Sequence, residues 1–428
     1  MYFSKGNSDK ELMLQAAKIT AEYIKENYVN KKYICVCGPG NNGGDGYYIG
    51  IYLYKAGFDV KIINALAYKT KSHLCFEAFN IAHDLNLIHE SSILNNLNKD
   101  VLIIDAIFGT SLKGSLDESI INLIQIMNSY EYVFSIDIPS GINPDTGVGC
   151  EVYVNANKTI SFVGRKLGLS LNEGKIATGE KYFHNLSLHM ENDYHAAATE
   201  YAFKDVESLL QKRPSNSHKG LFGSTLVLGG DKDMGGAAIM AAEAALKSGS
   251  GLVSLISHQT HLEASLVRNP EIMTIGCDHP KDAILALADK DVFVCGPGLS
   301  LSSWSDQIMK MLIKHLENND GSVIFDAGAL RYIAKNNISL KAIKGPIILT
   351  PHPGEAADLL RMSSKEIQQD RIKAAENLAA KYNATIVLKG AGTVIADDKI
   401  YVCEEGGPEL ATGGTGDVLA GLIGSLIA

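Results

Sequence analysis

The sequence predicts an α/β protein of two domains, each built on a mainly parallel β-sheet with helices on both faces. Short apolar runs typical of buried strands alternate along the chain with longer amphipathic stretches. The chain has 41 glycines, and they fall at the ends of these runs, where a chain turns. Its 428 residues are enough for two or three domains that each bury a core.

The first half contains four such runs. Between them, Ile49, Leu53 and Ala56 recur at helical spacing and predict an amphipathic helix. Strands that alternate with helices in this way lie parallel in one sheet. The expected strands span residues 33–37, 60–64, 101–105 and 132–136.

The second half shows the same alternation with different motifs, so the halves are not internal repeats. An alanine-rich segment at 237–246 predicts a closely packed helix. Residues 186–202 are polar and have no clear period, which places a boundary near Glu200 and predicts domains at 1–199 and 200–428. The expected strands span residues 225–228, 252–256, 292–295, 323–325, 347–349 and 385–388.

The chain ends in an apolar segment, residues 417–428, that predicts the start of a helix. This segment has no glycine cap, no basic last turn and no polar tail. Because an apolar helix needs packing partners, we expect the C-terminal part of the second domain to lie beyond residue 428.

Composition limits the classes of function. Lysine and arginine number 39 against 48 aspartates and glutamates, and the resulting net charge of −9 disfavours binding to nucleic acid. The sequence has no apolar run of membrane-spanning length and no signal-like core at its N-terminus, so we expect no membrane partner. Seven scattered cysteines favour a reducing compartment, and we expect a cytoplasmic protein.

A glycine-rich loop follows the first expected strand, where residues 38–46 read Gly-Pro-Gly-Asn-Asn-Gly-Gly-Asp-Gly. Such a loop at a helix start lets backbone N–H groups approach an anion, although a tight turn alone would also need glycines. Asp105 and Asp137 end two other expected strands, at the edge where open parallel sheets bind ligands, although either could instead cap a helix. Together with Asn42 and Ser140 they supply hard oxygen donors suited to potassium or a similar cation.

A second group of motifs follows strands of the second half. Residues 412–417, Thr-Gly-Gly-Thr-Gly-Asp, combine backbone donors that can hold an anion with Asp417, a base for a substrate hydroxyl. This combination suits phosphoryl transfer, and a plain glycine turn is the alternative. Residues 389–393, Lys-Gly-Ala-Gly-Thr, predict a phosphate loop or a simple hairpin, and prolines on both sides fix His352 at another strand end.

The motifs of the first half resemble the NAD(P)H-hydrate epimerase domain over about residues 10 to 190, on the strings at 37–46, 105–109 and 137–141. The resemblance implies a Rossmann-like, three-layer αβα domain with Asp137 as a candidate for proton transfer. It also implies potassium bound by Asn42, Asp105 and Ser140. The implied substrate contacts are Asn41, Asn42, Gly43, Gly44, Asp45, Gly109, Thr110, Ser111, Leu112, Lys113, Gly114, Ser115 and Asp137.

From about residue 205 onward the chain resembles the ribokinase-like αβα fold and, more narrowly, the ADP-dependent NAD(P)H-hydrate dehydratase. The strings at 218–223, 229–238, 248–253, 350–355 and 411–417 support this resemblance. The sequence differs from the family pattern at Asp326-Ala-Gly328, where the family usually has Asp-Ala-Asp. The implied hydrate contacts are Ala237, Gly298, His352 and Asp417, and the implied nucleotide contacts are Lys389, Gly390, Ala391, Gly392, Thr393 and Gly416.

Two such domains in this order resemble the bifunctional NAD(P)H-hydrate repair enzymes. The first domain would exchange the R and S epimers of hydrated NADH or NADPH. The second would use ADP with Mg²⁺ to phosphorylate the ring hydroxyl, with Asp417 as the base, and elimination would return the reduced cofactor with AMP and phosphate. The resemblance also implies a homo-oligomer, a tetramer or larger. Two alternatives are a ribokinase-like kinase for a small vitamin-precursor alcohol and a non-catalytic nucleotide-binding scaffold.

Overall fold

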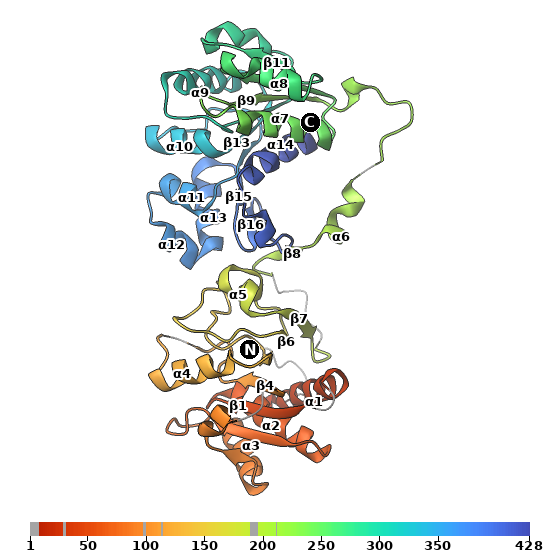
Figure 1. Cartoon of the computed structure of the whole chain (residues 1–428), viewed down its shortest axis with the longest axis vertical. Coiled ribbons are helices and arrows are strands. Elements are labelled where there is room, and N and C mark those ends of the chain that lie inside the picture. Colours follow the sequence, from red (N-terminus) through yellow and green to blue (C-terminus); the bar gives the residue numbers. More distant parts are fainter. Residues whose placement is uncertain (1–7, 29–30, 97–99, 113, 189–195, 211) are drawn as a thin grey trace. The chain divides into compact units, whose positions relative to one another are not determined.

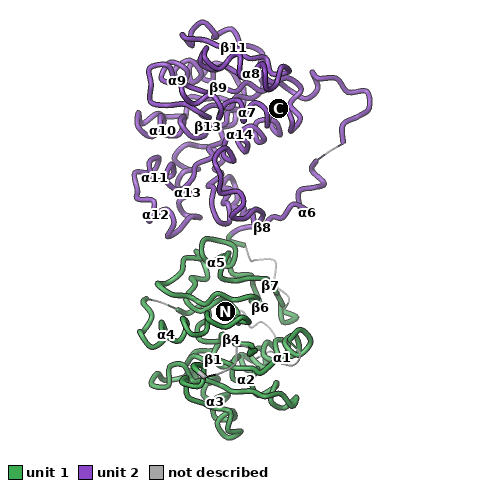
Figure 2. The backbone as a smooth tube through the Cα atoms, in the orientation of Figure 1, with its two compact units in different colours: residues 1–197 green, residues 198–428 purple. Residues whose placement is uncertain are grey.

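A computed structural model describes residues 8–28, 31–96, 100–112, 114–188, 196–210 and 212–428. The chain divides into two compact units, residues 1–197 and 198–428 (Figure 2). None of the helices in the described ranges combines the length and the apolar character that a membrane crossing requires. Lys113, one of the expected substrate contacts, lies outside the described residues.

The described part of the first unit forms a seven-stranded sheet in the order β3-β2-β1-β4-β5-β6-β7, and all of its pairings are parallel. Figure 1 labels β1, β4, β6 and β7 of this sheet. The strands are β1 (Lys32–Cys37), β2 (Val60–Asn64), β3 (Ile88–His89), β4 (Val101–Ala106), β5 (Tyr132–Ile136), β6 (Lys158–Phe162) and β7 (Glu180–His184). The helices are α1 (Asp9–Asn27), α2 (Asn41–Lys55), α3 (His73–Asp84), α4 (Glu118–Met127) and α5 (Asn172–Ala177).

Alternate side chains of β1 enter two different cores, which is why helices cover both faces of this sheet. Tyr33 and Cys35 pack with α1, α2 and α3 on one face. Ile34 and Val36 pack with α4 on the other face. The first unit is therefore the three-layer αβα domain that the sequence predicted.

The described part of the second unit forms a ten-stranded sheet in the order β11-β10-β9-β12-β13-β14-β15-β16-β17-β8. The strands are β8 (Thr199–Tyr201), β9 (Ser224–Leu228), β10 (Leu252–Ser257), β11 (Met273–Gly276), β12 (Val292–Cys295), β13 (Ser322–Phe325), β14 (Ile347–Leu349), β15 (Thr385–Leu388), β16 (Thr393–Ala396) and β17 (Ile400–Cys403). The pairings from β11 to β15 are parallel, whereas β16 pairs antiparallel with both β15 and β17.

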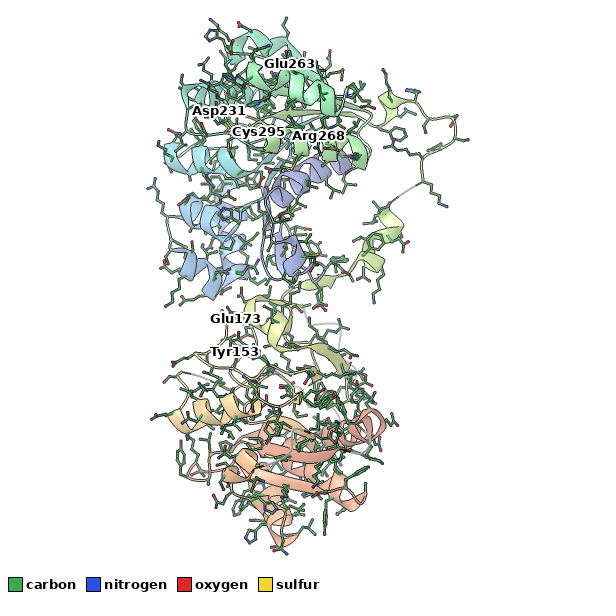
Figure 3. All side chains as sticks on the ribbon, viewed as in Figure 1. Tyr153, Glu173, Asp231, Glu263, Arg268 and Cys295 are labelled. Carbon is green, nitrogen blue, oxygen red and sulfur yellow. The ribbon has the colours of Figure 1, made fainter. Side chains whose placement is uncertain are left out.

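Helices also cover both faces of the second sheet. The helices in the described part of this unit are α6 (Phe203–Val206), α7 (Gly235–Ser248), α8 (Leu262–Arg268), α9 (Ser303–Leu316), α10 (Ala327–Asn336), α11 (Pro353–Leu360), α12 (Ser364–Gln369), α13 (Arg371–Tyr382) and α14 (Thr415–Ile427). Val292 and Val294 of β12 face the core formed with α7 and α14. Cys295, which Figure 3 labels, lies on the opposite side of the strand, and its Sγ is 3.6 Å from the sulfur of Met309 in α9.

The ten expected strands are all present, and their ends lie within one residue of the predicted ones. The helix predicted from Ile49 and Leu53 is α2, but it ends at Lys55, so Ala56 is exposed rather than on the buried face. The apolar helix expected at the end of the chain is α14. It packs so closely on α7 that a Cβ at Gly421 would lie 2.0 Å from the Ala241 carbonyl oxygen.

Candidate active sites

A cavity of about 830 Å³ lies in the first unit at the carboxyl ends of the parallel strands. Its walls come from α1, from the first turn of α2 and from the loops that follow β4, β5 and β6. Nine of the expected substrate contacts line this cavity, namely Asn41, Asn42, Asp45, Gly109, Thr110, Ser111, Leu112, Ser115 and Asp137.

Gly43 and Gly44 are instead buried in the first turn of α2. A Cβ at Gly43 would lie 1.9 Å from the Gly38 carbonyl oxygen, and a Cβ at Gly44 would lie 2.8 Å from the terminal carbon of Met13. Gly114 has φ +86°, a conformation that favours glycine. Gly43 thus needs glycine for the close approach of the backbone, whereas the neighbour of Gly44 is the flexible end of a side chain.

Asp105 is completely buried at the end of β4 and ties two loops together. Its carboxylate accepts hydrogen bonds from the Ser135 hydroxyl at 2.8 Å, from the Ser140 N–H at 2.8 Å and from the Ser140 hydroxyl at 2.6 Å. Burial raises the pKa of Asp105, and these hydrogen bonds oppose that rise. Asp105 and Ser140 therefore lie together behind the cavity wall.

Asn42 completes this group from the first turn of α2. Its side-chain N–H donates to the Phe108 carbonyl at 2.9 Å, and the Phe108 N–H donates to the Ser140 hydroxyl at 2.9 Å. The Asn42 Oδ1 atom is buried and has no hydrogen-bond partner among the described residues. Phe108 and Ser140 thus link Asn42 to the buried Asp105 carboxylate, and a buried oxygen without a hydrogen-bond partner suits a cation.

Asp137 lines the same cavity in a left-handed backbone conformation, φ +68°, that an aspartate adopts only rarely. Its carboxylate forms an ion pair with Lys166, whose ammonium also donates to the Phe162 carbonyl at 2.8 Å. Burial, and then the charge of Asp137, raise the pKa of Asp45 well above its usual range, while Lys166 opposes the rise. The cavity thus presents one ion-paired carboxylate and one carboxyl that favours its protonated form.

Sequence reasoning missed Lys166. It follows β6 by four residues, so it belongs to the same strand-end edge as Asp105 and Asp137. A basic residue just after a buried strand is the signal that could have found it.

The second site forms around Lys389, which follows β15. The Lys389 ammonium donates to Asp326 Oδ1 at 2.8 Å, and that oxygen also accepts the Thr350 hydroxyl at 2.7 Å. A Cβ at Gly416 would lie 3.5 Å from the ammonium nitrogen, so the first turn of α14 reaches the same point. The structure therefore brings Lys389, Asp326 and the 412–417 motif together.

Asp417 is half-buried in the first turn of α14. Burial, and next the negative charge of Asp326, raise the pKa of Asp417 to about 6, against the opposing charge of Lys389. A carboxylate with such a pKa is ionised at neutral pH and basic enough to accept a proton, which suits a general base.

His352 caps the N-terminus of α11. Its Nδ1 accepts the Gly354 N–H at 3.0 Å, and its Nε2 lies 3.3 Å from a carboxylate oxygen of buried Glu355. Burial alone would raise the pKa of Glu355, but hydrogen bonds from His352 and the charge of Lys389 lower it. The imidazole is about half exposed, at 49% of its side chain, so it remains free to meet a ligand at the edge where Lys389 lies.

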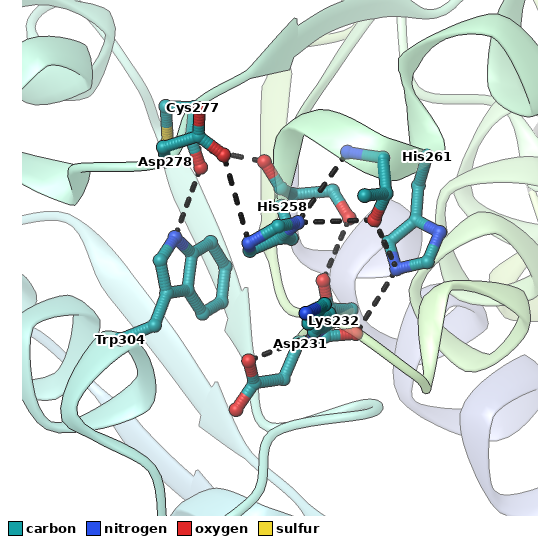
Figure 4. Close-up of polar contacts among 10 residues, drawn as sticks. Asp231, Lys232, His258, His261, Cys277, Asp278 and Trp304 are labelled. Atoms are coloured by element: carbon teal, nitrogen blue, oxygen red, sulfur yellow. Dashed lines mark hydrogen bonds and ion pairs between the residues drawn. The ribbon is translucent and has the colours of Figure 1, made fainter.

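Gly298 and Ala237 flank the loop between β9 and α7. A Cβ at Gly298 would lie 2.3 Å from the Met234 carbonyl, and φ there is +69°, so this close approach requires glycine. Buried Asp231 fixes the loop, because its N–H donates to the Gly298 carbonyl at 2.9 Å and its carboxylate accepts the hydroxyls of Ser300, Ser302 and Ser305. Figure 4 shows His261 on the other side, where its Nε2 lies 3.0 Å from the Asp231 carbonyl oxygen.

Residues 389–393 form the turn between β15 and β16, with Gly390 and Ala391 exposed. The Thr393 hydroxyl donates to the Gly390 carbonyl at 3.3 Å. The turn therefore has hairpin geometry, because β15 and β16 are antiparallel, and it still presents Lys389 at the second site.

Comparison with known proteins matches both halves of the chain to families. Residues 225–428 match the family described as NAD(P)H-hydrate dehydratase, and residues 9–168 match the one described as YjeF-related protein N-terminus. The bifunctional NAD(P)H-hydrate repair enzyme of Coxiella burnetii is 36% identical over 99% of this chain and 86% of its own length. The Escherichia coli K12 protein of the same name is 35% identical over 97% of this chain and 80% of its own length.

The second unit also resembles a solved structure. A ribokinase-like superfamily protein from Enterococcus faecalis V583 is 32% identical, with a TM-score of 0.50, over 55% of this chain and 82% of its own. The fold of the second unit is therefore ribokinase-like, as the sequence predicted.

Proposed function

Because this chain belongs to the family of bifunctional NAD(P)H-hydrate repair enzymes, we propose that its two units act in turn on the same damaged cofactor. The chain is an enzyme that repairs hydrated NADH and NADPH. This conclusion depends on its 36% identity to a named repair enzyme over 99% of its length. We assign epimer exchange to residues 1–199 and dehydration to residues 200–428. The relatives favour neither the kinase nor the scaffold alternative.

In the first unit, the nicotinamide end of the hydrate would occupy the 830 Å³ cavity. Epimer exchange requires the hydroxyl to leave its ring carbon as water and a water to return on the opposite face. Asp45, which favours its protonated form, would supply the proton to the leaving hydroxyl. Asp137 would accept the proton of the returning water, and its ion pair with Lys166 would hold its carboxylate in place.

In the second unit, Asp417 would accept the proton of the ring hydroxyl as that oxygen attacks the β-phosphorus of ADP. The O–P bond forms, the bond to the bridging oxygen breaks, and AMP leaves. Backbone N–H groups at the start of α14 and the Lys389 ammonium would stabilise the charge on the phosphoryl oxygens. Phosphate then leaves the ring with its bonding electrons, and loss of a proton from the adjacent carbon restores the double bond.

Mg²⁺ fits this second site. The ion usually binds through one or two carboxylates together with the phosphate oxygens of a nucleotide. Asp326 is the carboxylate that the Lys389 ammonium contacts, so it would hold Mg²⁺ against the phosphates, and Asp417 would stay free to act as the base. The ion would supply further neutralisation of phosphate charge.

Potassium fits the buried group behind the first cavity. Asn42 Oδ1 is the unpartnered oxygen, and Asp105 and Ser140 add a carboxylate and a hydroxyl. These residues would hold the ion beneath the loop that follows β4. The ion would supply local positive charge to fix the Asn42 and Phe108 segments together.

The potassium assignment predicts an effect on thermal stability. In the wild-type chain, potassium at about ten times its Kd should raise the melting temperature by about 3 to 6 °C, because it binds only the folded state. Asn42→Ala should abolish this rise, as measured by differential scanning calorimetry against sodium. Asn41→Ala is the matched control, since Asn41 bonds Ser72 instead and should keep the potassium effect. An equal rise in the Asn42 variant would contradict the assignment.

The elevated pKa of Asp417 predicts a pH dependence. The base must be ionised, so activity is present above a pKa of about 6 and falls as pH drops through it. The dehydration rate at saturating substrate should be about tenfold lower at pH 5 than at pH 7, from the ionised fractions of a group with that pKa. The rate is measured from the increase in absorbance of the reduced nicotinamide, with the S hydrate and ADP as substrates. A flat profile across this range would exclude Asp417 as the base.

The overall assignment is tested by mixing the chain with hydrated NADH, with and without ADP and Mg²⁺. Recovery of NADH with one phosphate and one AMP per turnover is the expected result. A stable phosphorylated product without NADH would point to a kinase instead. Assembly into a homo-oligomer, a cytoplasmic location and the lack of a nucleic-acid partner stay predictions.

A further inference from the structure

Arg371 is the first residue of α13 and lies fully buried, with 1% of its surface exposed. Its guanidinium donates from Nη1 to the Ala391 carbonyl at 2.5 Å and from Nη2 to the Leu388 carbonyl at 3.0 Å. Its Nε has no hydrogen-bond partner among the described residues. The side chain therefore holds both ends of the turn that contains Lys389 and Gly390.

The turn is shaped around this guanidinium. Gly390 has φ +151°, and a Cβ there would lie 2.7 Å from Arg371 Nη2, so only glycine lets the backbone pass so close. On its outer side, Gly390 and Ala391 are exposed. The buried guanidinium of Arg371 thus lies directly beneath the exposed turn at Gly390.

This charge has no countercharge in the described part of the chain, because the ion pairs found there do not include Arg371. Burial lowers the pKa of Arg371 to about 10, which still leaves the guanidinium charged at neutral pH. Carbonyl groups satisfy N–H donors, but they do not neutralise a buried charge, and a buried unpaired ion is costly. The fold retains this cost, which indicates that an anion outside the fold offsets it.

We propose that Arg371 is a positioning residue of the second site, whose charge is balanced by the phosphates of the nucleotide bound at the Lys389–Thr393 turn. The inference rests on the nucleotide role assigned to that turn above. Arg371 does not touch the nucleotide in this arrangement. It shapes the turn through its hydrogen bonds to the Leu388 and Ala391 carbonyls. Its positive charge attracts the phosphates across the backbone of Gly390, which has no side chain to keep them apart.

Two variants separate charge from shape. Arg371→Gln removes the charge and keeps an N–H donor for a carbonyl, whereas Arg371→Lys keeps the charge and loses the planar fork. Lys373→Met is the matched control, because Lys373 lies two residues further along α13, is exposed and pairs with Glu376. Calorimetric titration of each full-length chain with adenosine, AMP and Mg-ADP gives the affinities.

We expect Arg371→Gln to weaken ADP binding about 10- to 100-fold, the range for losing an interaction with a charged group. The loss should grow from adenosine to AMP to ADP, because only the phosphates sense the charge. Arg371→Lys should keep the preference for ADP over adenosine within about threefold, since the charge remains near the turn. Lys373→Met should bind all three ligands as the wild type does.

Other outcomes overturn the proposal. Equal losses for adenosine and ADP would assign Arg371 a role in the shape of the turn alone. Unchanged ADP affinity in the glutamine variant would remove it from the site. If that variant fails to fold, seen as loss of an unfolding transition in calorimetry, the lysine variant still decides, because a lost preference for ADP contradicts the charge role. A wild-type chain that binds no ADP would instead overturn the proposed function.

Discussion

Asp417→Asn is expected to abolish nucleotide-dependent recovery of NADH while exchange between the two epimers continues. Asparagine cannot accept the hydroxyl proton, and removal of a general base costs about 10² to 10⁴ in rate. The substitution keeps the size of the side chain, and Asp417 lies half-buried beside Asp326, whose charge opposes its own. Removing one of two like charges should leave the melting temperature unchanged or higher.

The measurement is the rate of NADH recovery from the S hydrate with ADP, alongside chromatographic separation of the epimers. Asp398→Asn is a suitable control, because Asp398 is exposed in the turn between β16 and β17. A variant that loses both activities to the same degree would contradict the assignment of two separate sites. A variant that keeps full recovery of NADH would remove Asp417 from the chemistry.

Asp137→Asn should have the opposite effect. Exchange should slow by about 10² to 10⁴, because the group that takes up the proton of the returning water is lost. Asparagine tolerates the left-handed backbone at this position, where φ is +68°, so the loop should keep its shape. Dehydration of pure S hydrate should continue at the wild-type rate.

A mixture of epimers provides the sharpest readout for this variant. With ADP present, the S form should be consumed and the R form should persist, whereas the wild-type chain consumes both. Asp145→Asn is the matched control, since Asp145 is exposed in a nearby loop. Continued consumption of the R form by the Asp137 variant at the wild-type rate would exclude this role.

Buried strands were predictable where their sequences are continuous apolar runs, whereas β6, which is buried but contains Thr159 and Ser161, was not predicted. β4 and β12 are buried along their whole length and match the prediction closely. β7 was not predicted, because it lies at the edge of its sheet and its first residues, Glu180 to Tyr182, are exposed and partly charged. The antiparallel β16 and β17 were also missed, because they are only partly buried and near the edge of the sheet.

The glycine-rich loops were recognised, but the sequence could not divide their glycines by role. Gly43 and Gly44 are buried against Gly38 and Met13, whereas Asn41, Asn42 and Asp45 of the same string line the cavity. The difference arises from the start of α2 at Asn41, which turns successive residues towards the protein or towards the cavity. The sequence alone does not show which residues of the loop face the cavity.

The sequence by itself determined the fold class, the polar residues at the carboxyl ends of the strands and the two families that those residues resemble. This is possible because parallel strands joined by helices bring their carboxyl ends to one edge, however far apart they are in the chain. Only the tertiary structure decided which side chains meet at that edge. Lys166 reaches Asp137, Lys389 reaches Asp326 across 63 residues, and Arg371 lies under Gly390. Such contacts depend on the conformations of loops and side chains, which packing between distant segments selects and local sequence does not.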